Sequence, residues 1–204
     1  MANEKSKEDK HNRIISAAIK IFARKGFYHS RVSEIASEAG VADGTIYLYF
    51  KNKDDLLISL FEEKMNALIE ICDRELSGIE EPLDKLERLI KMHLELIQTD
   101  RDLAEVLTVE LRQSAKFMRE YTPKPFLAYL KLYETIISEG QKKGVIRVDI
   151  SPKVVSRAIF GAMDELALSW ALTRKKPYDL SSATKELSSL FIDGIGAGET
   201  KKEA

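Results

Sequence analysis

Cysteine and histidine are scarce in this chain of 204 residues, and their scarcity excludes several kinds of site. The single cysteine, Cys72, rules out an internal disulfide and a thiolate metal cluster, and its apolar helical surroundings predict an ordinary core residue. The histidines are His11, His29 and His93, far apart in the sequence. The one Glu-x-x-His spacing, from Glu8 to His11, lies in a charged segment, so paired di-iron motifs are absent. Phosphate loops, nucleophile elbows and zinc spacings are absent too, so we expect neither an enzyme nor a metal or cofactor.

Long apolar runs are also missing. No run approaches the ~18 residues that a membrane-spanning helix needs, and the N-terminal MANEKSKEDKHNR is charged rather than signal-like. A cytoplasmic protein with no membrane partner is therefore predicted, with residues 1–9 disordered. Net charge is −1, and residues 1–55 hold ten Lys and Arg against eight Asp and Glu, hence +2. A nucleic-acid binder with so weak an excess must place its few cations well.

Two short helical patterns separated by a glycine lie within residues 30–53. In the first, apolar residues recur at helical spacing after Ser30, the expected N-cap, and Gly40 is the expected stop. The second pattern spans about two turns and directs Ile46 and Phe50 inward. Two helices joined by a short glycine-containing turn make a helix-turn-helix, whose second helix enters the major groove of DNA. The alternative is a surface helical hairpin with ordinary packing.

The segments around this pair are helical as well. Residues 10–25 carry one apolar stripe that gives the pair a hydrophobic floor. After Asn52, an expected N-cap, a helix runs to residue 76 and at ~1.5 Å per residue spans more than ~35 Å. An extended connection is expected at 146–150, and further helices at 83–97, 103–118, 125–140, 152–172 and 182–195. The predicted fold is all-α, with a helix-turn-helix domain at 1–55 joined by the long helix to a ligand-binding and dimerisation domain at 56–204.

Residues 154–172 are apolar nearly all round, whereas a surface helix shows a polar face. Together with the last helix they can form half of an intermolecular four-helix bundle, in which Gly161 and Ala162 permit close approach. The alternative is the central helix of a monomeric bundle. A helix-turn-helix monomer reads only a half-site, so DNA binding favours a homodimer. The residues expected at the dimer interface are Val155, Ile159, Ala162, Leu166, Leu187, Leu190, Phe191 and Ile195.

Several of these residues together resemble the DNA-binding domain of TetR-type repressors over about 50 residues. They are Gly26, Phe27 and Tyr28, then Ile35, Ala36, Ala39, Gly40 and Val41, then the runs GTIY from Gly44 and YFKNKDDL from Tyr49. The resemblance implies a homodimeric all-α repressor that binds operator DNA and releases it when a small ligand enters the C-terminal domain.

A longer resemblance, to the FadR-type repressors of fatty-acid degradation within this family, covers most of the chain. It is carried by the runs GVADGTIYLYFKNKDDLLISLFEEKM, VELRQS and AIFGAMDE. It implies a long-chain acyl-CoA as the effector and operators at β-oxidation genes. The alternative is a TetR-type repressor that responds to another hydrophobic drug or metabolite, for example one that controls an efflux gene.

Positions that match the family imply a set of DNA contacts. Arg31, beside Ser30 at the start of the first short helix, suits a phosphate, and Gly44 lets the backbone approach the duplex. Thr45 suits a base edge or a thymine methyl, and Asp43 suits a helix cap or a cytosine amine. Ala42 departs from the Ser or Thr often found there, which removes one contact and cap. The implied set is Ser30, Arg31, Asp43, Gly44, Thr45, Tyr47, Tyr49 and Lys53, the tyrosines on phosphates, sugars or methyl groups and Lys53 as a phosphate clamp.

Aromatic and soft apolar side chains of the later helices can line a tunnel for an acyl chain, although any core has the same composition. Arg112 follows the apolar run VLTVEL and needs a partner, either one of the carboxylates Glu110, Asp164 and Glu165 or a ligand's polar head. Lys116, Arg119, Lys124 and Lys131 suit coenzyme A phosphates or plain solvent. The candidate ligand residues are Phe61, Met65, Met92, Leu96, Leu107, Leu111, Arg112, Gln113, Phe126, Tyr129, Leu130, Tyr133, Phe160, Met163 and Trp170.

Overall fold

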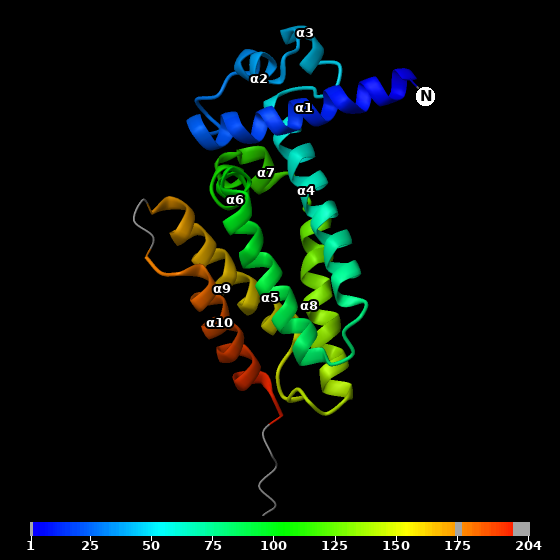
Figure 1. The fold of residues 1–204 in the computed structure, drawn as a ribbon, viewed down its shortest axis with the longest axis vertical. Helices are drawn as coiled ribbons and strands as arrows, with labels where there is room; N and C mark the ends of the chain where they lie inside the picture. The colour runs from blue at the N-terminus through cyan, green and yellow to red at the C-terminus, as the bar shows by residue number, and fades with distance from the viewer. Residues whose placement is uncertain (1, 174–176, 198–204) are drawn as a thin grey trace, which may run out of the picture. The chain divides into compact units, whose positions relative to one another are not determined.

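The computed structural model of the chain describes residues 2–173 and 177–197, and these are helical almost throughout (Figure 1). Among them, β structure is limited to one isolated antiparallel bridge between Ile146 and Gly196, so the predicted all-α fold is confirmed. None of the helices in the described ranges is long and apolar enough to cross a membrane. The chain divides into two compact units, one of residues 1–64 and 100–123 and the other of residues 65–99 and 124–204.

The first unit combines the N-terminal helices with a later segment that packs against them. Its elements are α1 (Ala2–Lys25), α2 (Val32–Ala39), α3 (Asp43–Ile46), the first part of α4 (Lys53–Leu76), α6 (Arg101–Thr108), the 3₁₀ helix η1 (Glu110–Gln113) and α7 (Ala115–Arg119). α1 packs against α2 and α6, and α2 packs against α3. Each large side chain in this core stabilises the unit by about 1.5–3 kcal/mol. The side chains that are at most 2% exposed there include Ile14, Ile15, Phe22, Ile35, Ile46, Phe50 and Leu57.

The glycine stops of α1 and α2 are confirmed, but the predicted start of α2 is wrong. Gly26 and Gly40 have φ of 79° and 64°, and Val41 N–H donates to the Ala36 carbonyl at 3.0 Å to close the end of α2. The N-cap of α2 is Arg31 rather than Ser30. Ser30 is only 4% exposed because its hydroxyl donates to the Phe27 carbonyl at 2.8 Å.

The N-terminal residues correct a second prediction. α1 begins at Ala2, so residues 2–9 continue the helix instead of being disordered. Lys and Glu favour helix, and Asp9 pairs with Arg13 one turn later at 3.4 Å. The Tyr49 hydroxyl also donates to the Lys7 carbonyl at 3.2 Å.

The predicted single helix over 103–118 is broken in the structure. α6 ends at Thr108, η1 follows, and Ser114 opens α7 by accepting the N–H of Phe117 at 3.1 Å. Ser114 also donates to Asp54 Oδ1 of α4 at 2.6 Å. The break therefore places two polar turns against the N-terminal helices, which a continuous helix would not do.

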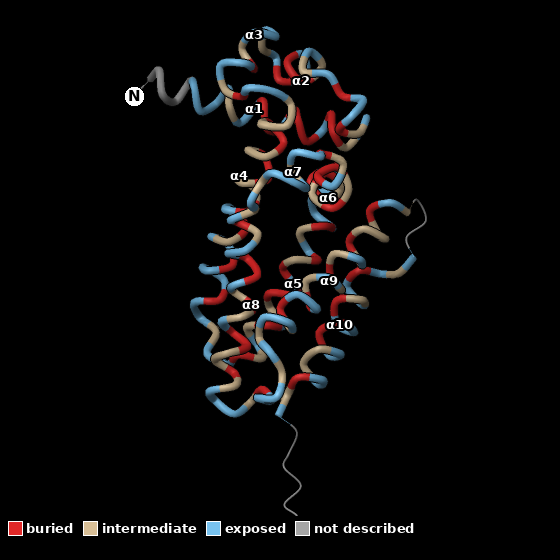
Figure 2. The backbone as a smooth tube through the Cα atoms, turned by 180° about the vertical axis from the view of Figure 1, so that it is seen from behind, coloured by how far each residue is buried: buried red, intermediate tan, exposed pale blue. Residues whose placement is uncertain are grey.

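The second unit is a helical body with its own core. It contains the rest of α4, α5 (Pro82–Thr99), α8 (Lys124–Lys142), α9 (Pro152–Leu172) and α10 (Leu180–Ile195). α9 packs beside α8, and α10 packs beside α5. The buried positions of these helices are red in Figure 2 and include Leu86, Leu89, Ile90, Tyr129, Tyr133, Ile137, Ile159 and Met163. In α8, Gly140 makes room for Ile146: a Cβ there would lie 2.4 Å from Cδ1 and 2.7 Å from Cγ1 of Ile146, so a larger residue would displace that side chain. The extended connection expected at 146–150 is only partly right: Ile146 forms that one bridge, but residues 148–150 form a turn and a bend.

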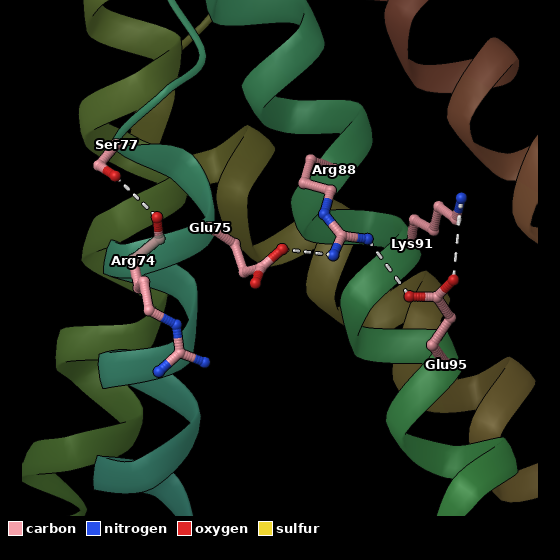
Figure 3. Close-up of polar contacts among 6 residues, drawn as sticks. All are labelled: Arg74, Glu75, Ser77, Arg88, Lys91 and Glu95. Atoms are coloured by element: carbon pink, nitrogen blue, oxygen red, sulfur yellow. Dashed lines mark hydrogen bonds and ion pairs between the residues drawn. The ribbon is translucent and has the colours of Figure 1, made fainter.

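A polar network on the second unit joins the end of α4 to α5 (Figure 3). Nη2 of Arg88 donates to Glu75 Oε2 at 2.7 Å, and Nη1 donates to Glu95 Oε2 at 3.3 Å. Lys91 pairs with the other oxygen of Glu95 at 3.8 Å. The Arg88 guanidinium lowers the pKa of the Glu75 carboxyl. Exposed pairs contribute little net stability, so the network mainly fixes how the two helices meet.

The two units do not coincide with the predicted domains. Residues 100–123 belong to the predicted second domain but pack within the first unit, and the boundary inside α4 falls after Lys64 rather than residue 55. Asn52 caps α4 as predicted, since its Oδ1 accepts the N–H of Asp55 at 2.9 Å. The division into domains at 1–55 and 56–204 remains a prediction.

Candidate nucleic-acid interface and effector region

α2, a three-residue link and α3 form the helix-turn-helix. α3 itself is short, but the N–H of Phe50 donates to the Ile46 carbonyl at 3.0 Å and adds another turn. Ile46 and Phe50 are each 2% exposed and anchor this turn in the core. Tyr47 and Leu48, which follow Ile46, are exposed, so this segment presents one inner and one outer face.

The outer face contains four of the eight predicted DNA contacts and one further exposed residue that was not predicted. Asp43 and Gly44 are exposed and Thr45 is half-buried. Tyr47 is 59% exposed, and Leu48, which was not among the predicted contacts, is 79% exposed. Leu48 lies midway between the two buried anchors, so helical spacing alone could have placed it outward. Contact between this leucine and an apolar group, such as a thymine methyl, would be favourable because it removes apolar surface from water.

The start of α3 carries no side-chain cap. Ala42 occupies the N-cap position, and only its carbonyl accepts, from the N–H of Thr45 at 2.8 Å. This confirms the missing cap expected at Ala42. Asp43 lies in the first turn of α3, where a carboxylate is favourable.

Two predicted contacts already have partners within the chain. The ring of Tyr49 lies 5.8 Å from that of His11, and its hydroxyl is bound to the carbonyl of Lys7. Ser30 is buried, so its hydroxyl does not face solvent. Arg31, by contrast, is exposed at the N-cap of α2, and its own N–H donates to Glu34 Oε2 at 3.0 Å.

Lys53 is used inside the chain. Its Nζ donates to the carbonyls of Phe27, Tyr28 and Ser30, the last two at 3.1 Å, and lies 4.5 Å from the centre of the Phe27 ring. An ammonium has three N–H groups, and all three have carbonyl partners here. Partial burial lowers the pKa of Lys53. The predicted phosphate clamp stays a prediction, but the side chain has a clear structural role.

Part of the predicted ligand set lies around a row of hydrogen-bonded side chains in the second unit. His93 Nδ1 lies 3.0 Å from the Tyr129 hydroxyl, which lies 3.0 Å from that of Tyr133. The Tyr133 hydroxyl contacts the Met163 sulfur at 3.8 Å, and the His93 ring meets the edge of Phe160. Burial lowers the pKa of His93 to about 4 and raises the pKa of both tyrosines. The side chains of His93, Tyr129 and Tyr133 are therefore all uncharged at neutral pH.

The remaining ligand candidates are divided between the two units. Phe61 packs against Phe117 and Tyr121 in the first unit, with ring centres 5.0 and 6.2 Å away. Gln113 donates to Glu110 Oε1 at 3.2 Å. Arg112 is exposed, so the premise that its charge enters an apolar face is wrong. The other buried candidates are Met65, Met92, Leu111 and Leu130, and those of intermediate exposure are Leu96, Leu107, Phe126 and Trp170.

The predicted dimer residues fall into two groups. Ile159, Leu187 and Ile195 are at most 8% exposed and belong to the core of their own chain. Leu190 is 70% exposed, and it borders a groove between α9 and α10 that is also lined by Leu166 and Tyr178. The other residues of intermediate exposure are Val155, Ala162 and Phe191. Gly161 is exposed, and a Cβ there would meet no atom of the chain within 4 Å.

Comparison with known proteins identifies the family to which this architecture belongs. The family profile "Bacterial regulatory proteins, tetR family" matches residues 14–60, and the profile "YsiA-like protein, C-terminal region" matches residues 61–194. The fatty acid metabolism regulator protein of Bacillus subtilis is 39% identical over 191 residues, which cover 94% of this chain and 98% of that protein. The chain belongs to the TetR family of bacterial regulators.

Solved structures extend the similarity of this TetR-family protein to both units. A crystal structure of FadR from Bacillus subtilis in complex with stearoyl-CoA matches with a TM-score of 0.84 and 39% identity, covering 90% of this chain and 98% of that one. FadR from Bacillus halodurans matches with a TM-score of 0.85 and 37% identity, covering 91% and 95%. The protein is thus a TetR-family transcriptional regulator homologous to FadR, which confirms the predicted family. Because the family consists of transcriptional regulators, the prediction of no enzyme is confirmed as well.

Proposed function

We propose that this regulator represses fatty-acid-degradation genes in the cytoplasm, binding a palindromic operator as a homodimer and leaving it when a long-chain acyl-CoA binds. One observation carries the proposal. The chain is 39% identical over 94% of its length to a fatty acid metabolism regulator, and it shares its fold with a FadR that was crystallised with stearoyl-CoA.

The operator is read by the outer face of α3 and its following turn. Arg31 and the α2 N-terminus bind phosphate, while Gly44 and Thr45 approach the bases, flanked by Asp43. Tyr47 and Leu48 supply the exposed aromatic and apolar surface for sugars and thymine methyls. Ser30, Tyr49 and Lys53 support this interface indirectly. Each donates a hydrogen bond to a backbone carbonyl and so holds the surrounding backbone in place. Few direct hydrogen bonds to bases are available, so DNA shape supplies part of the specificity.

The homodimer forms through α9 and α10. Leu190 and the groove beside it are an exposed apolar surface, and Gly161 and Ala162 let a partner helix approach closely. Val155, Leu166 and Phe191 continue that surface, whereas Ile159, Leu187 and Ile195 support it from the core. Two recognition helices held about 34–36 Å apart then fit successive major grooves.

The acyl chain of the effector lies among the apolar candidates of the helical body, near Met163, Phe160 and Phe126. The exposed cations Arg112, Lys116 and Arg119 suit the phosphates of coenzyme A. Acyl-CoA shifts the equilibrium only if it binds the DNA-incompetent arrangement more tightly than the competent one. In that arrangement the two recognition helices no longer have the spacing that the operator requires.

One experiment tests the whole proposal. An operator is selected from a random duplex library with the full chain, and its affinity is measured by fluorescence anisotropy with and without stearoyl-CoA. Free coenzyme A and stearate, each at the same concentration, are the controls. We expect release by stearoyl-CoA and by neither control. Release by unrelated hydrophobic drugs, with no response to stearoyl-CoA, would replace the effector class, and failure to select any DNA would remove the repressor function.

A further inference from the structure

The turn between α1 and α2, residues 26–30, is bound by two charged side chains from distant parts of the sequence. On one edge, Lys53 donates to the carbonyls of Phe27, Tyr28 and Ser30. On the other, the N–H of Phe27 donates to Glu110 Oε2 at 2.5 Å. The Lys53 ammonium thus binds carbonyl groups of the turn, and the Glu110 carboxylate binds one of its N–H groups. This α1–α2 turn leads directly into Arg31 and α2.

Glu110 is a buried glutamate, only 5% exposed. A buried carboxylate is unfavourable unless it is well hydrogen-bonded. Here Oε2 accepts the Phe27 N–H and Oε1 accepts from Gln113 Nε2 at 3.2 Å. A Cβ added at Gly26 would lie only 3.5 Å from Oε2, so the carboxylate packs close to the turn. Bonds between an ionised acceptor and a backbone N–H are among the stronger ones in proteins.

The segment that carries Glu110 is attached to the N-terminal helices at two other points. Ser114 donates to Asp54 Oδ1 and the Tyr121 hydroxyl donates to Glu62 Oε1, each at 2.6 Å and each to a residue of α4. We call residues 110–121 the clamp segment. It lies within residues 61–194, which match the C-terminal family profile, yet it packs within the first unit. The effector region of the sequence therefore contributes a piece of the DNA-reading unit.

We propose that Glu110 is a positioning residue for operator binding, and that its bond to Phe27 is where the clamp segment controls the helix-turn-helix. This inference rests on the proposed function. The carboxylate fixes the α1–α2 turn, and the turn sets the position of Arg31 and the start of α2. When the bond is intact, α2 and α3 hold the arrangement that the operator selects. A displacement of the clamp segment moves the acceptor, and the buried N–H of Phe27 then loses this partner.

The test compares full-length Glu110→Ala and Glu110→Gln with wild type. Gln retains an oxygen that accepts the Phe27 N–H, whereas Ala retains none. Glu120→Gln, at an exposed glutamate of the clamp segment, is the matched control. We expect Ala to weaken operator binding about tenfold or more, Gln to recover most of that loss, and the control to match wild type. Hydrogen exchange in the peptide over residues 23–31 should quicken in Ala only.

Two further readouts separate positioning from a general loss of structure. Stearoyl-CoA should bind the DNA-free Ala variant within about twofold of wild type. The ratio of operator dissociation constants with and without stearoyl-CoA should fall toward one, because the coupling bond is already absent. Faster exchange throughout the first unit, or an unchanged ratio, would assign Glu110 a merely structural role and overturn the proposal.

The proposal and the proposed function can fail separately. If wild type binds operator but does not respond to stearoyl-CoA, the effector assignment fails while the affinity of the Ala variant still decides whether Glu110 positions the turn. If wild type binds no DNA, both fail. Operator affinity of the Ala variant within about twofold of wild type, with a normal stearoyl-CoA response in wild type, overturns only the role of Glu110.

Discussion

Replacing Lys53 by Gln separates two roles that one lysine can have at a DNA-binding surface. The ammonium binds the carbonyls of Phe27, Tyr28 and Ser30 and lies 4.5 Å from the centre of the Phe27 ring. Hydrogen bonds from a charged donor are worth about 1.5–3 kcal/mol, and partial exposure keeps the net loss near the lower end of that range. A loss of about 2 kcal/mol in a chain of this size lowers the melting temperature by about 4–8 °C.

The salt dependence of operator binding gives the second measurement. A lysine that neutralises a phosphate contributes about one unit to the slope of log K against log salt for each subunit. Because the three N–H groups of Lys53 already have partners, we expect Lys53→Gln to lower the melting temperature and weaken operator binding with little change in slope. Lys51→Gln is the matched control, since Lys51 is exposed and lies two residues earlier. An unchanged melting temperature together with a flattened slope would refute this reasoning and make Lys53 a phosphate clamp.

Three other predictions follow from exposure and from burial. Leu48→Ala should weaken operator binding by about 1–2 kcal/mol without lowering the melting temperature, because the side chain is 79% exposed; equal affinity in anisotropy titrations would remove Leu48 from the interface. Leu190→Glu should convert the proposed dimer to monomer in light scattering and weaken operator binding; a dimer that persists would place the interface elsewhere. The folded-state pKa of His93, about 4, is below its usual 6.5, so the unfolded chain takes up a proton first as pH falls. Stability should therefore decrease by about 2 kcal/mol from pH 7 to pH 5 in urea unfolding, and His93→Gln should flatten that dependence; an equal slope in the variant would contradict the assignment.

Local signals in the sequence were sufficient for most of the helices. The apolar stripes of α1 and α4 and the glycine stops at residues 26 and 40 are periodic or conformational features, which depend on residues close in sequence. The same local reasoning placed Asn52 and Ala42 correctly at helix starts. It also directed Ile46 and Phe50 inward, from which the outward position of Leu48 follows.

The candidate site was less predictable because its side chains depend on distant partners. Glu110 and Phe27 are 83 residues apart, and no local pattern indicates that one binds the other. Ser30 looked like a helix cap, but its hydroxyl is taken by a carbonyl of the preceding turn. Lys53 looked like a surface cation, because the three carbonyls that it binds lie 23 to 26 residues earlier in the sequence. Tertiary contacts decide such cases, since a short polar side chain can satisfy several local geometries equally well.

The bond between the Tyr49 hydroxyl and the carbonyl of Lys7 has a consequence for how the N-terminus can evolve and be engineered. The acceptor is a main-chain atom, so the identity of the amino acid at position 7 is free to drift. What has to be kept is the helical backbone of α1 around residue 7, which holds this carbonyl next to Tyr49. A proline introduced near residue 9 would end that path, whereas swaps among glutamate, lysine and alanine would preserve it.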